Sequence, residues 1–241
     1  MKWTEKYDVK FHETDANEVV SVSQTFKYIQ ETAMRQMRGI NQSYEYLFEH
    51  KKAFILSAIR LEMYAPIYAY DKIEAKTWAS EGRGYTYPRY YEIERDGETV
   101  CKATSTWALV DTETKKLLPV GSIDTSKYPI EEPVKTEHTA RIRIPSALPL
   151  ALVGEYTVKY SDIDLNGHMN NTNYANFLCD YIPNIEKLRI TSIGIAFLNE
   201  AKYKENLKIY IARVDSKYFI RTIRSDGNVN VEAEVIFETM E

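Results

Sequence analysis

The second half of the chain reads Ser161-Asp162-Ile163-Asp164-Leu165-Asn166-Gly167-His168-Met169-Asn170-Asn171. Within this segment a carboxylate (Asp164), a carboxamide (Asn166) and an imidazole (His168) occupy every second position, directly before a predicted helix. Together such groups can orient a water molecule, hold a carbonyl oxygen and transfer a proton. The sequence therefore predicts a catalytic site here, built on one of only four histidines in the chain.

An incomplete copy of this segment lies near the start of the chain. Asp15 and Asn17 align with the aspartate and the asparagine at an offset of 149 (164 − 15 and 166 − 17), but Val19 stands in place of the histidine. We therefore predict an internal repeat whose first copy cannot carry out the same proton transfer.

A second pair of matching positions supports the repeat. An Asp-Gly pair, typical of a tight hairpin turn, occurs at 96–97 and again at 226–227, an offset of 130. The second copy is thus 19 residues shorter between the two anchors (149 − 130), and we assign the extra length to residues 39–52.

Each copy shows the same order of predicted elements: a strand, a loop, a helix and four further strands. Helical spacing of apolar residues predicts helices near 23–38, with Gly39 as the stop, and near 171–181, closed by Pro183. Alternating apolar residues predict strands. These lie near 5–12, 54–64, 71–80, 84–95 and 98–111 in the first copy, and near 154–161, 190–201, 206–215, 217–224 and 229–238 in the second.

One helix followed by an antiparallel sheet, twice, indicates an α+β fold in which each sheet can wrap around its helix and the two units can pair. We divide the chain into an N-terminal repeat at 1–120, a proline-containing linker at 121–150 and a C-terminal repeat at 151–241.

Composition narrows the classes of function. The net charge of −4 argues against a broad nucleic-acid surface, and no apolar run is long enough to span a membrane. Residues 1–20 do not resemble a signal peptide. Cys101 and Cys179 are the only cysteines, and two do not make a disulfide framework. We expect a cytoplasmic protein.

Three motifs resemble the acyl-acyl-carrier-protein (acyl-ACP) thioesterases of plants and bacteria, which have a hotdog fold. The first is Asp162–Tyr174, which resembles the family's catalytic loop. The second is Ala103–Val110 with the basic turn Thr114–Leu117, and the third is Ile195–Ala201, where the family has a strand that ends in Glu-Cys. The resemblance implies two tandem hotdog repeats, each a long helix wrapped by an antiparallel sheet. It also implies hydrolysis of acyl-ACP to a free fatty acid and holo-ACP, which ends chain elongation.

The resemblance assigns catalysis to Asp164, Asn166, His168 and Glu200, with no metal or cofactor. Glu200 would act as the general base or orient His168, which relays a proton. Asp164 would fix the imidazole or the Asn166 amide, and the Asn166 amino group would stabilise the oxyanion. The chain departs from the plant pattern at Ala201, where those enzymes have cysteine, so we expect attack by water rather than by a thiol.

Further expectations concern the surroundings of the site. Backbone amides near Asn170 and Asn171 would assist the oxyanion, although Asp, Asn and Thr residues here can equally serve as helix caps and turns. In the first copy the position facing Glu200 is Pro66, at an offset of 134 (200 − 66). The family's N-terminal repeat holds the acyl chain, so Met34, Met37 and the strand near Phe54 to Met63 would line that pocket, or would simply be core.

The expected partner is an acyl carrier protein that carries a fatty acyl thioester. Because this carrier is acidic, the basic residues that flank the site in sequence are candidates to dock it: Lys187, Arg189, Lys202 and Lys204. The alternatives are an acyl-CoA thioesterase, a hotdog hydratase and a non-catalytic acyl-binding protein. The hydratases place aspartate and histidine five positions apart, whereas Asp164 and His168 are four apart. A monomer or a homodimer fits a fused double hotdog, and His12 lacks a second histidine at metal-ligand spacing.

Overall fold

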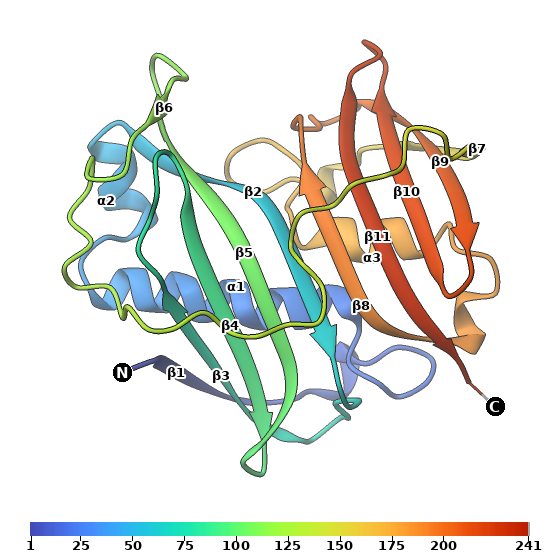
Figure 1. The fold of residues 1–241 in the computed structure, drawn as a ribbon, viewed down its shortest axis with the longest axis horizontal. Helices are drawn as coiled ribbons and strands as arrows, with labels where there is room; N and C mark the ends of the chain where they lie inside the picture. Colours follow the sequence, from blue (N-terminus) through green and yellow to red (C-terminus); the bar gives the residue numbers. More distant parts are fainter. Residues whose placement is uncertain (241) are drawn as a thin grey trace.

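A single antiparallel sheet runs through the whole molecule, with the helices on one side of it (Figure 1). The structure, a computed structural model, describes residues 1–240. The first half contributes β1 (Trp3–Asp8), β2 (Lys52–Met63), β3 (Lys72–Ala79), β4 (Tyr87–Arg95), β5 (Glu98–Asp111) and β6 (Leu117–Leu118). The second half contributes β7 (Ala151–Thr157), β8 (Leu188–Phe197), β9 (Asn206–Val214), β10 (Lys217–Arg224) and β11 (Val229–Thr239). The predicted α+β pattern thus appears as a large antiparallel sheet with few helices.

The strand order is the same in the two halves when each half is read from its edge to the middle of the sheet. The order is β1-β3-β4-β5-β2-β8-β11-β10-β9-β7, and the short β6 pairs with β5 outside this path. Read from each edge inward, β1-β3-β4-β5-β2 of the first half corresponds strand by strand to β7-β9-β10-β11-β8 of the second. The two central strands, β2 and β8, pair antiparallel. The two Asp-Gly pairs join β4 to β5 and β10 to β11, as the turn signal predicts.

Helix α1 (Val22–Gly39) crosses the sheet of the first half. Its N-terminus is capped by Ser21, whose side chain accepts a hydrogen bond from the backbone N–H of Gln24, and its buried face includes Phe26 and Ile29. Gly39 was expected to stop the helix, but it is the last helical residue. Position 39 requires glycine because a Cβ there would overlap the Trp3 indole.

The second half has a much shorter helix than the pattern predicts. Helix α3 spans Asn173–Cys179 rather than residues 171–181, so the expectation of a long helix in each copy is wrong for the second copy. The reason is local: Asn170 forms a turn that delays the start, and the chain after Cys179 turns before Pro183. Helix α2 (Tyr44–Glu49) and the one-turn 3₁₀ helices at Phe11–Glu13, Tyr160–Asp162 and Ile185–Lys187 complete the elements.

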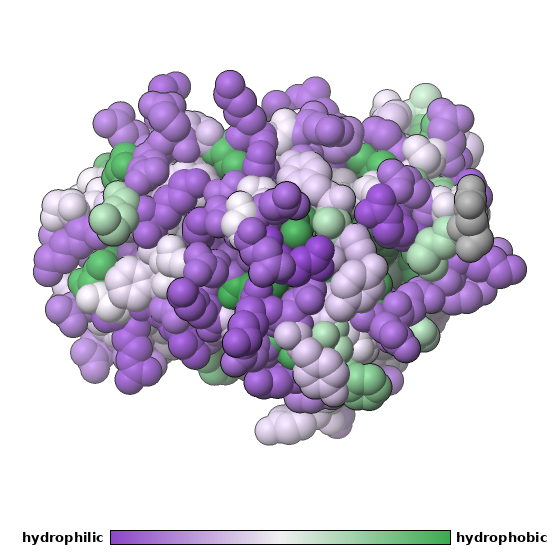
Figure 2. Space-filling view, turned by 90° about the horizontal axis from the view of Figure 1, so that it is seen from below, coloured by the Kyte–Doolittle hydropathy of each residue, from purple (hydrophilic) through white to green (hydrophobic). Residues whose placement is uncertain are grey.

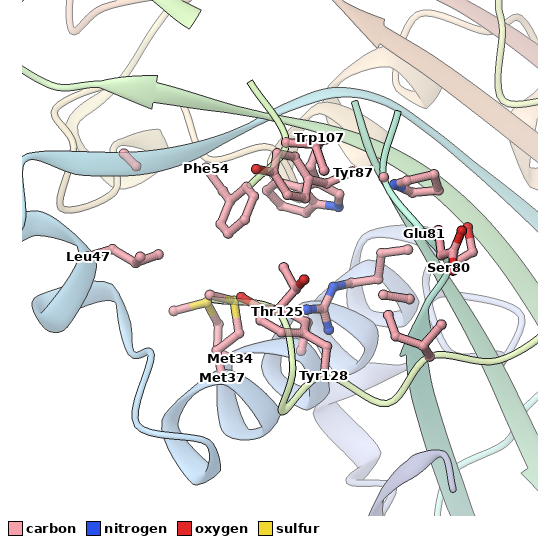
Figure 3. Close-up of a pocket in the computed structure, with 18 of the residues that line it drawn as sticks. Met34, Met37, Leu47, Phe54, Ser80, Glu81, Tyr87, Trp107, Thr125 and Tyr128 are labelled. Carbon is pink, nitrogen blue, oxygen red and sulfur yellow. The ribbon is translucent and has the colours of Figure 1, made fainter. Parts of the chain in front are cut away.

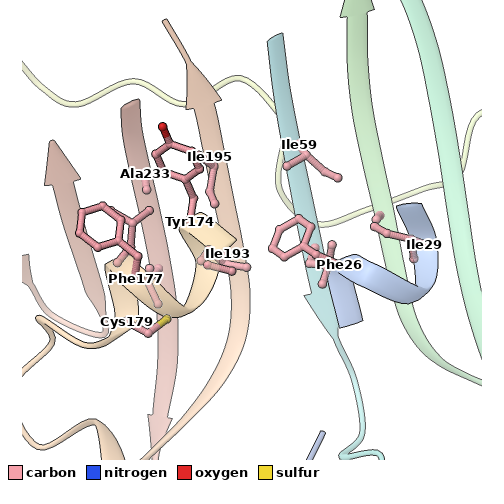
Figure 4. Close-up of a cluster of buried hydrophobic side chains, with 14 of the residues drawn as sticks. Phe26, Ile29, Ile59, Tyr174, Phe177, Cys179, Ile193, Ile195 and Ala233 are labelled. Atoms are coloured by element: carbon pink, nitrogen blue, oxygen red, sulfur yellow. The ribbon is translucent and has the colours of Figure 1, made fainter. Parts of the chain in front are cut away.

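One continuous hydrophobic core joins the two halves. Phe26 of α1 lies against β2, Ile29 lies farther along the same helix, and Tyr174 and Phe177 of α3 lie against β8 and β11 (Figure 4). The starts of α1 and α3 also touch, since the Ser23 hydroxyl donates to the Thr172 carbonyl at 2.8 Å. The two halves therefore pack as one body around the β2–β8 pair.

The segment between the halves, residues 119–150, is extended but closely bound. It pairs with the end of β3, where Glu131 and Ala79 form a backbone hydrogen bond. Further along it is held on the outer face of the sheet, because the Glu62 carboxylate accepts the backbone N–H groups of Glu137 and His138. The predicted linker is thus a strap that covers the sheet rather than a free tether.

One face of the molecule is mainly polar. On the face in Figure 2, hydrophilic side chains dominate and apolar ones form small separate patches. Within residues 1–240, no helix is both long and apolar enough to cross a membrane.

Candidate active site

A tight loop presents the predicted catalytic residues between β7 and α3. The backbone N–H of Asp164 donates to the His168 carbonyl at 3.0 Å, and the N–H of Gly167 donates to the Asp164 carbonyl at 3.0 Å. Gly167 has a φ of +76°, a conformation that other residues rarely adopt. The loop is therefore closed on itself and holds Asn166 and His168 in fixed directions.

Asp164 stabilises this loop rather than the imidazole. Its Oδ1 accepts the backbone N–H of Asn166 at 2.8 Å, which forms the side-chain turn that aspartate favours. Asp164 was expected to contact either the imidazole or the Asn166 side chain, and it contacts neither. Asp164 instead orients Asn166 through its backbone.

His168 and Glu200 meet at the surface of the second half. The two side chains approach to 3.0 Å between Nε2 and Oε2, with the imidazole half-buried and the carboxylate exposed. Glu200 lies in the turn after β8, not in the strand, and an isolated bridge between His168 and Lys202 brings the two segments together. The structure thus brings together two predicted site residues that are 32 positions apart (200 − 168).

Tyr44, at the start of α2, adds a contact that the sequence analysis missed. Its hydroxyl donates to Asn166 Oδ1 at 2.8 Å, so the first half reaches into the loop of the second. Burial raises the pKa of Tyr44, and the nearby Asp164 carboxylate raises it further, so the phenol stays protonated as a donor. A signal was present, because Tyr44 lies in the segment 39–52 that only the first copy has.

Asn170 has a structural role. Its Oδ1 accepts hydrogen bonds from the backbone N–H and the hydroxyl of Thr172, each at 3.0 Å. Its own backbone N–H donates to the Asp162 carbonyl at 2.8 Å, so the expectation that this amide assists an oxyanion is wrong. Within residues 1–240, no such hydrogen bond occupies the Asn171 amide.

The first copy contains the same loop without its chemistry. Asp15 N–H donates to the Val19 carbonyl, and Asp15 Oδ1 accepts the N–H of Asn17, both at 2.8 Å. Val19 forms an isolated bridge with Tyr68 as His168 does with Lys202, and the two partner residues are offset by 134 (202 − 68). These contacts confirm the predicted alignment, in which Pro66 of the first copy is the counterpart of Glu200 in the second.

Ala201 lies directly after Glu200 but does not face the site. It is completely buried, and its carbonyl accepts the backbone N–H of Met169 at 2.9 Å. A side chain at this position points into the core, away from the exposed Glu200 carboxylate. The departure from the family's cysteine therefore leaves the surface of the site unchanged.

A cavity of about 630 Å³ opens in the first half, beside the loop. Met34 and Met37 of α1 face Phe54, Tyr87 and Trp107 of the sheet across it (Figure 3). The remaining lining residues include Tyr44, Leu47, Ala53, Ser80, Glu81, Arg89, Thr125, Tyr128 and Ile130. Of the expected lining, Met34, Met37 and the start of the strand near Phe54 are present. The contribution of the strap, through Thr125, Tyr128 and Ile130, was not foreseen.

Tyr44 joins the cavity to the predicted catalytic loop, since it lines the cavity and donates a hydrogen bond to Asn166 in the loop.

The predicted basic residues differ in their surroundings. Arg189 is paired with Glu238, whereas Lys187, Lys202 and Lys204 form no ion pair with residues 1–240. Over the same residues, no group of three or more histidine, cysteine, aspartate or glutamate side chains is arranged to hold a metal ion.

Comparison with solved structures identifies the fold. An acyl-ACP thioesterase from Bacteroides thetaiotaomicron superposes with a TM-score of 0.89, at 24% identity over 98% of this chain and 97% of that one. The 12:0-ACP thioesterase from Umbellularia californica gives a TM-score of 0.84 at 15% identity, covering 99% and 97% of the two chains. The protein thus has the fold of acyl-ACP thioesterase structures.

The sequence places the chain in the same family. It matches the acyl-ACP thioesterase N-terminal domain over residues 1–124 and the C-terminal domain over residues 150–239. The chain belongs to the acyl-ACP thioesterase family. A chloroplastic palmitoyl-acyl carrier protein thioesterase of Arabidopsis thaliana is 23% identical over 216 residues, which are 81% of this chain and 51% of the relative. The chain spans about half the length of such curated relatives.

Proposed function

We propose that the protein hydrolyses fatty acyl-ACP to a free fatty acid and holo-ACP, which ends chain elongation. The observation that carries the proposal is the 3.0 Å approach of His168 Nε2 to Glu200 Oε2 beside Asn166, whose amide oxygen is held by Tyr44. Membership of the family and the fold of its solved structures support it.

The fold supports a finer description as two tandem hotdog repeats. The mirrored strand order, the helix inside each half-sheet and the β2–β8 pair fit two such units fused in one chain. We assign residues 1–120 to the repeat with the degenerate site, 121–150 to the strap and 151–241 to the catalytic repeat. A fused pair already contains the partner that a single repeat needs, so a monomer or a homodimer is compatible with it.

In the proposed reaction a water molecule attacks the thioester carbonyl carbon. His168 accepts the proton from water through Nδ1, while Glu200 holds the proton on Nε2 and so positions the ring. The amino group of Asn166 donates to the developing oxyanion, because its amide oxygen is already occupied by Tyr44. The carbon–sulfur bond then breaks, and the proton passes from His168 to the departing thiolate.

The acyl chain would occupy the cavity of the first half. Its methionine, phenylalanine, tyrosine and tryptophan side chains offer an apolar lining, and Tyr44 connects it to the loop. This assigns opposite roles to the two copies: the second performs the chemistry, and the first, with valine in place of histidine, holds the chain.

The acyl carrier would dock through basic residues that flank the site in sequence. Lys202 and Lys204 follow Glu200 closely, whereas Lys187 lies at the other end of β8, where the Glu186 carbonyl accepts a hydrogen bond from Asn17 of the degenerate loop. Lys187, Lys202 and Lys204 are free of ion pairs within residues 1–240, so their charges are available to an acidic partner. The main alternative, hydrolysis of acyl-CoA, would use the same catalytic residues.

Two buried, unpaired cysteines favour a reducing compartment such as the cytoplasm.

The test is thiol release from acyl-ACP and acyl-CoA of matched chain length. We expect rapid release from acyl-ACP and slow release from acyl-CoA. His168→Ala and Glu200→Ala should each lower kcat by about 100-fold or more, the lower bound expected for loss of a general acid–base group. Asn17→Ala, in the degenerate loop of the first copy, is the matched control and should leave the rate unchanged.

Two results would contradict the proposal. If folded wild-type protein released thiol from neither substrate, the chain would be an acyl-binding protein. If acyl-CoA were hydrolysed faster than acyl-ACP, the chemistry would stand but the partner would be wrong.

A further inference from the structure

The apolar cavity of the first half contains a buried cation without a counter-ion. Arg89 of β4 lines the cavity and is only 7% exposed. Its Nη1 donates to Gln36 Oε1 at 2.9 Å and to Thr77 Oγ1 at 3.3 Å, both of which are neutral. Within residues 1–240 it forms no ion pair with a carboxylate, which separates it from the buried Arg60, paired with Glu234 at 3.0 Å.

The neighbouring amide is also incompletely bonded. Gln36 of α1 is fully buried, and its Nε2 has no hydrogen-bond partner among residues 1–240. The other charged residue of the cavity, Glu81, is exposed and does not reach Arg89 within ion-pair distance. The aromatic ring of Tyr128 lies 5.8 Å from the Arg89 guanidinium and gives only weak compensation.

Such an arrangement is costly unless a ligand completes it. A buried charge or donor without a partner destabilises the fold, and an acceptor that arrives with a ligand removes this penalty. A purely hydrocarbon chain cannot do so, because it offers no acceptor and displaces solvent from the guanidinium. An oxygen atom on the chain, above all a carboxylate, can accept from the free guanidinium nitrogens.

We propose that Arg89, held in place by Gln36 behind the cavity wall, forms a polar subsite in the cavity that selects acyl chains with an oxygen substituent remote from the thioester, a carboxylate being preferred to a hydroxyl or oxo group. This inference rests on the proposed function in one respect: the cavity receives the acyl chain. It adds a specificity that an apolar lining alone would not provide. The thioester end lies toward Tyr44 and Asn166, and the oxygenated part of the chain lies at Arg89.

The test begins with binding, which does not depend on catalysis. Methyl esters of fatty acids and monomethyl esters of dicarboxylic acids, matched across a series of chain lengths, are titrated by calorimetry. At the chain length that reaches Arg89, the carboxylate ester should bind about 10- to 100-fold more tightly, the range expected for hydrogen bonds to a charged group. The ω-hydroxy ester should fall between the two.

Two variants remove the preference in different ways. Arg89→Met deletes the cation, and Gln36→Glu keeps it but supplies a counter-ion at the position that already contacts Nη1. Both should bring the two esters to within about threefold of each other. Met34→Leu changes the same cavity without altering its charge and should keep the preference. Circular dichroism confirms that each variant is folded. If Arg89→Met does not fold, Gln36→Glu still tests the proposal, because it keeps the Arg89 side chain in place.

The outcomes separate this proposal from the proposed function. Equal binding of the two esters by the wild type, or a preference that survives both variants, would overturn the polar subsite. The same chains are then presented as acyl-ACP thioesters. Hydrolysis without a preference contradicts the subsite alone, whereas ester binding with the preference but no hydrolysis of either thioester contradicts the enzymatic function alone.

Discussion

Tyr44 links the two copies at the scale of a single residue. Its hydroxyl occupies the Asn166 carbonyl oxygen, which leaves the amino group of the same amide to donate elsewhere. Without this bond, rotation of the amide by half a turn would present the oxygen, an acceptor, to an oxyanion. In the proposed reaction, Tyr44 is therefore a positioning residue that acts through Asn166.

Tyr44→Phe should lower kcat by about 2- to 10-fold, the range for loss of one neutral hydrogen bond, with little change in KM. The pH profile of kcat should keep its shape, because the phenol itself transfers no proton in the proposed reaction. Steady-state kinetics on acyl-ACP measure both quantities. Tyr46→Phe on the same helix is the control, since within residues 1–240 its hydroxyl has no hydrogen bond. An unchanged kcat in Tyr44→Phe would show that the amide needs no such support.

Ala201→Cys restores the residue that plant members of the family carry. We expect kcat to change by less than about threefold, because position 201 is completely buried and a thiolate, the reactive form, is disfavoured there. Cys179 in the same half illustrates the effect: burial raises its pKa to about 12. The measurement is hydrolysis of acyl-ACP before and after treatment with an alkylating agent. A large gain in rate that alkylation abolishes would establish a nucleophilic thiol and contradict attack by water.

At the scale of elements, Gly39 sets two effects against each other. Alanine is a better helix former than glycine by about 1 kcal/mol, which favours Gly39→Ala. A Cβ at this position would overlap the Trp3 ring of β1, and overpacking typically costs about 1–3 kcal/mol. We expect the steric effect to prevail, so the variant should unfold at a lower urea concentration. In a Trp3→Val background, Gly39→Ala should instead stabilise. Stabilisation in both backgrounds would show that the indole moves aside at no cost.

Elements built from local patterns were predicted well. Alternation of apolar residues placed β5 (Glu98–Asp111) and β10 (Lys217–Arg224) at their observed bounds, and helical spacing located α1 to within one residue at each end. Helix α3 was overestimated, because apolar spacing continues through Tyr181 although the backbone turns earlier. The start of α3 was placed too early for a different reason: it follows the turn formed by Asn170, whose side-chain hydrogen bonds are not visible in a hydrophobic pattern.

Features that depend on contacts between distant residues could not be predicted. The loop residues Asn166 and His168 were found because they are close in sequence, but Tyr44 lies 122 positions from Asn166. The segment 121–150 was predicted only as a linker, since its prolines and polar residues do not reveal that Glu62 binds its backbone. Arg89 has no motif around it, and its significance follows only from the cavity it lines.

At the scale of the whole molecule, the two halves are related by a local two-fold axis. In the β2–β8 pair Leu61 faces Ile193 and Ile59 faces Ile195, so equivalent positions at an offset of 134 exchange places (193 − 59 and 195 − 61). Arg60 faces its own counterpart, Gly194 (194 − 60), and so marks the axis. The symmetry is broken at this point, since only one arginine is present.

The single arginine joins both halves and the strap. Its Nε donates to the Thr139 carbonyl at 2.7 Å, its Nη1 to the Ser192 hydroxyl at 3.1 Å and its Nη2 to Glu234 at 3.0 Å. A second arginine at position 194 would place two like charges together, and even a Cβ there would overlap the Arg60 guanidinium and Ile142 of the strap. Gly194 is therefore required by the way that the strap crosses the axis.

Gly194→Ala should lower the free energy of unfolding by about 1–3 kcal/mol, the typical cost of overpacking a core. Ile142→Ala alone should also destabilise, because Ile142 is buried. In the double variant the overlap with Ile142 is gone and only the overlap with the Arg60 guanidinium remains, so the combined loss should be smaller than the sum of the two single losses. Urea unfolding of the four proteins in this cycle measures the coupling. Strictly additive losses would mean that the strap does not press on the β2–β8 pair.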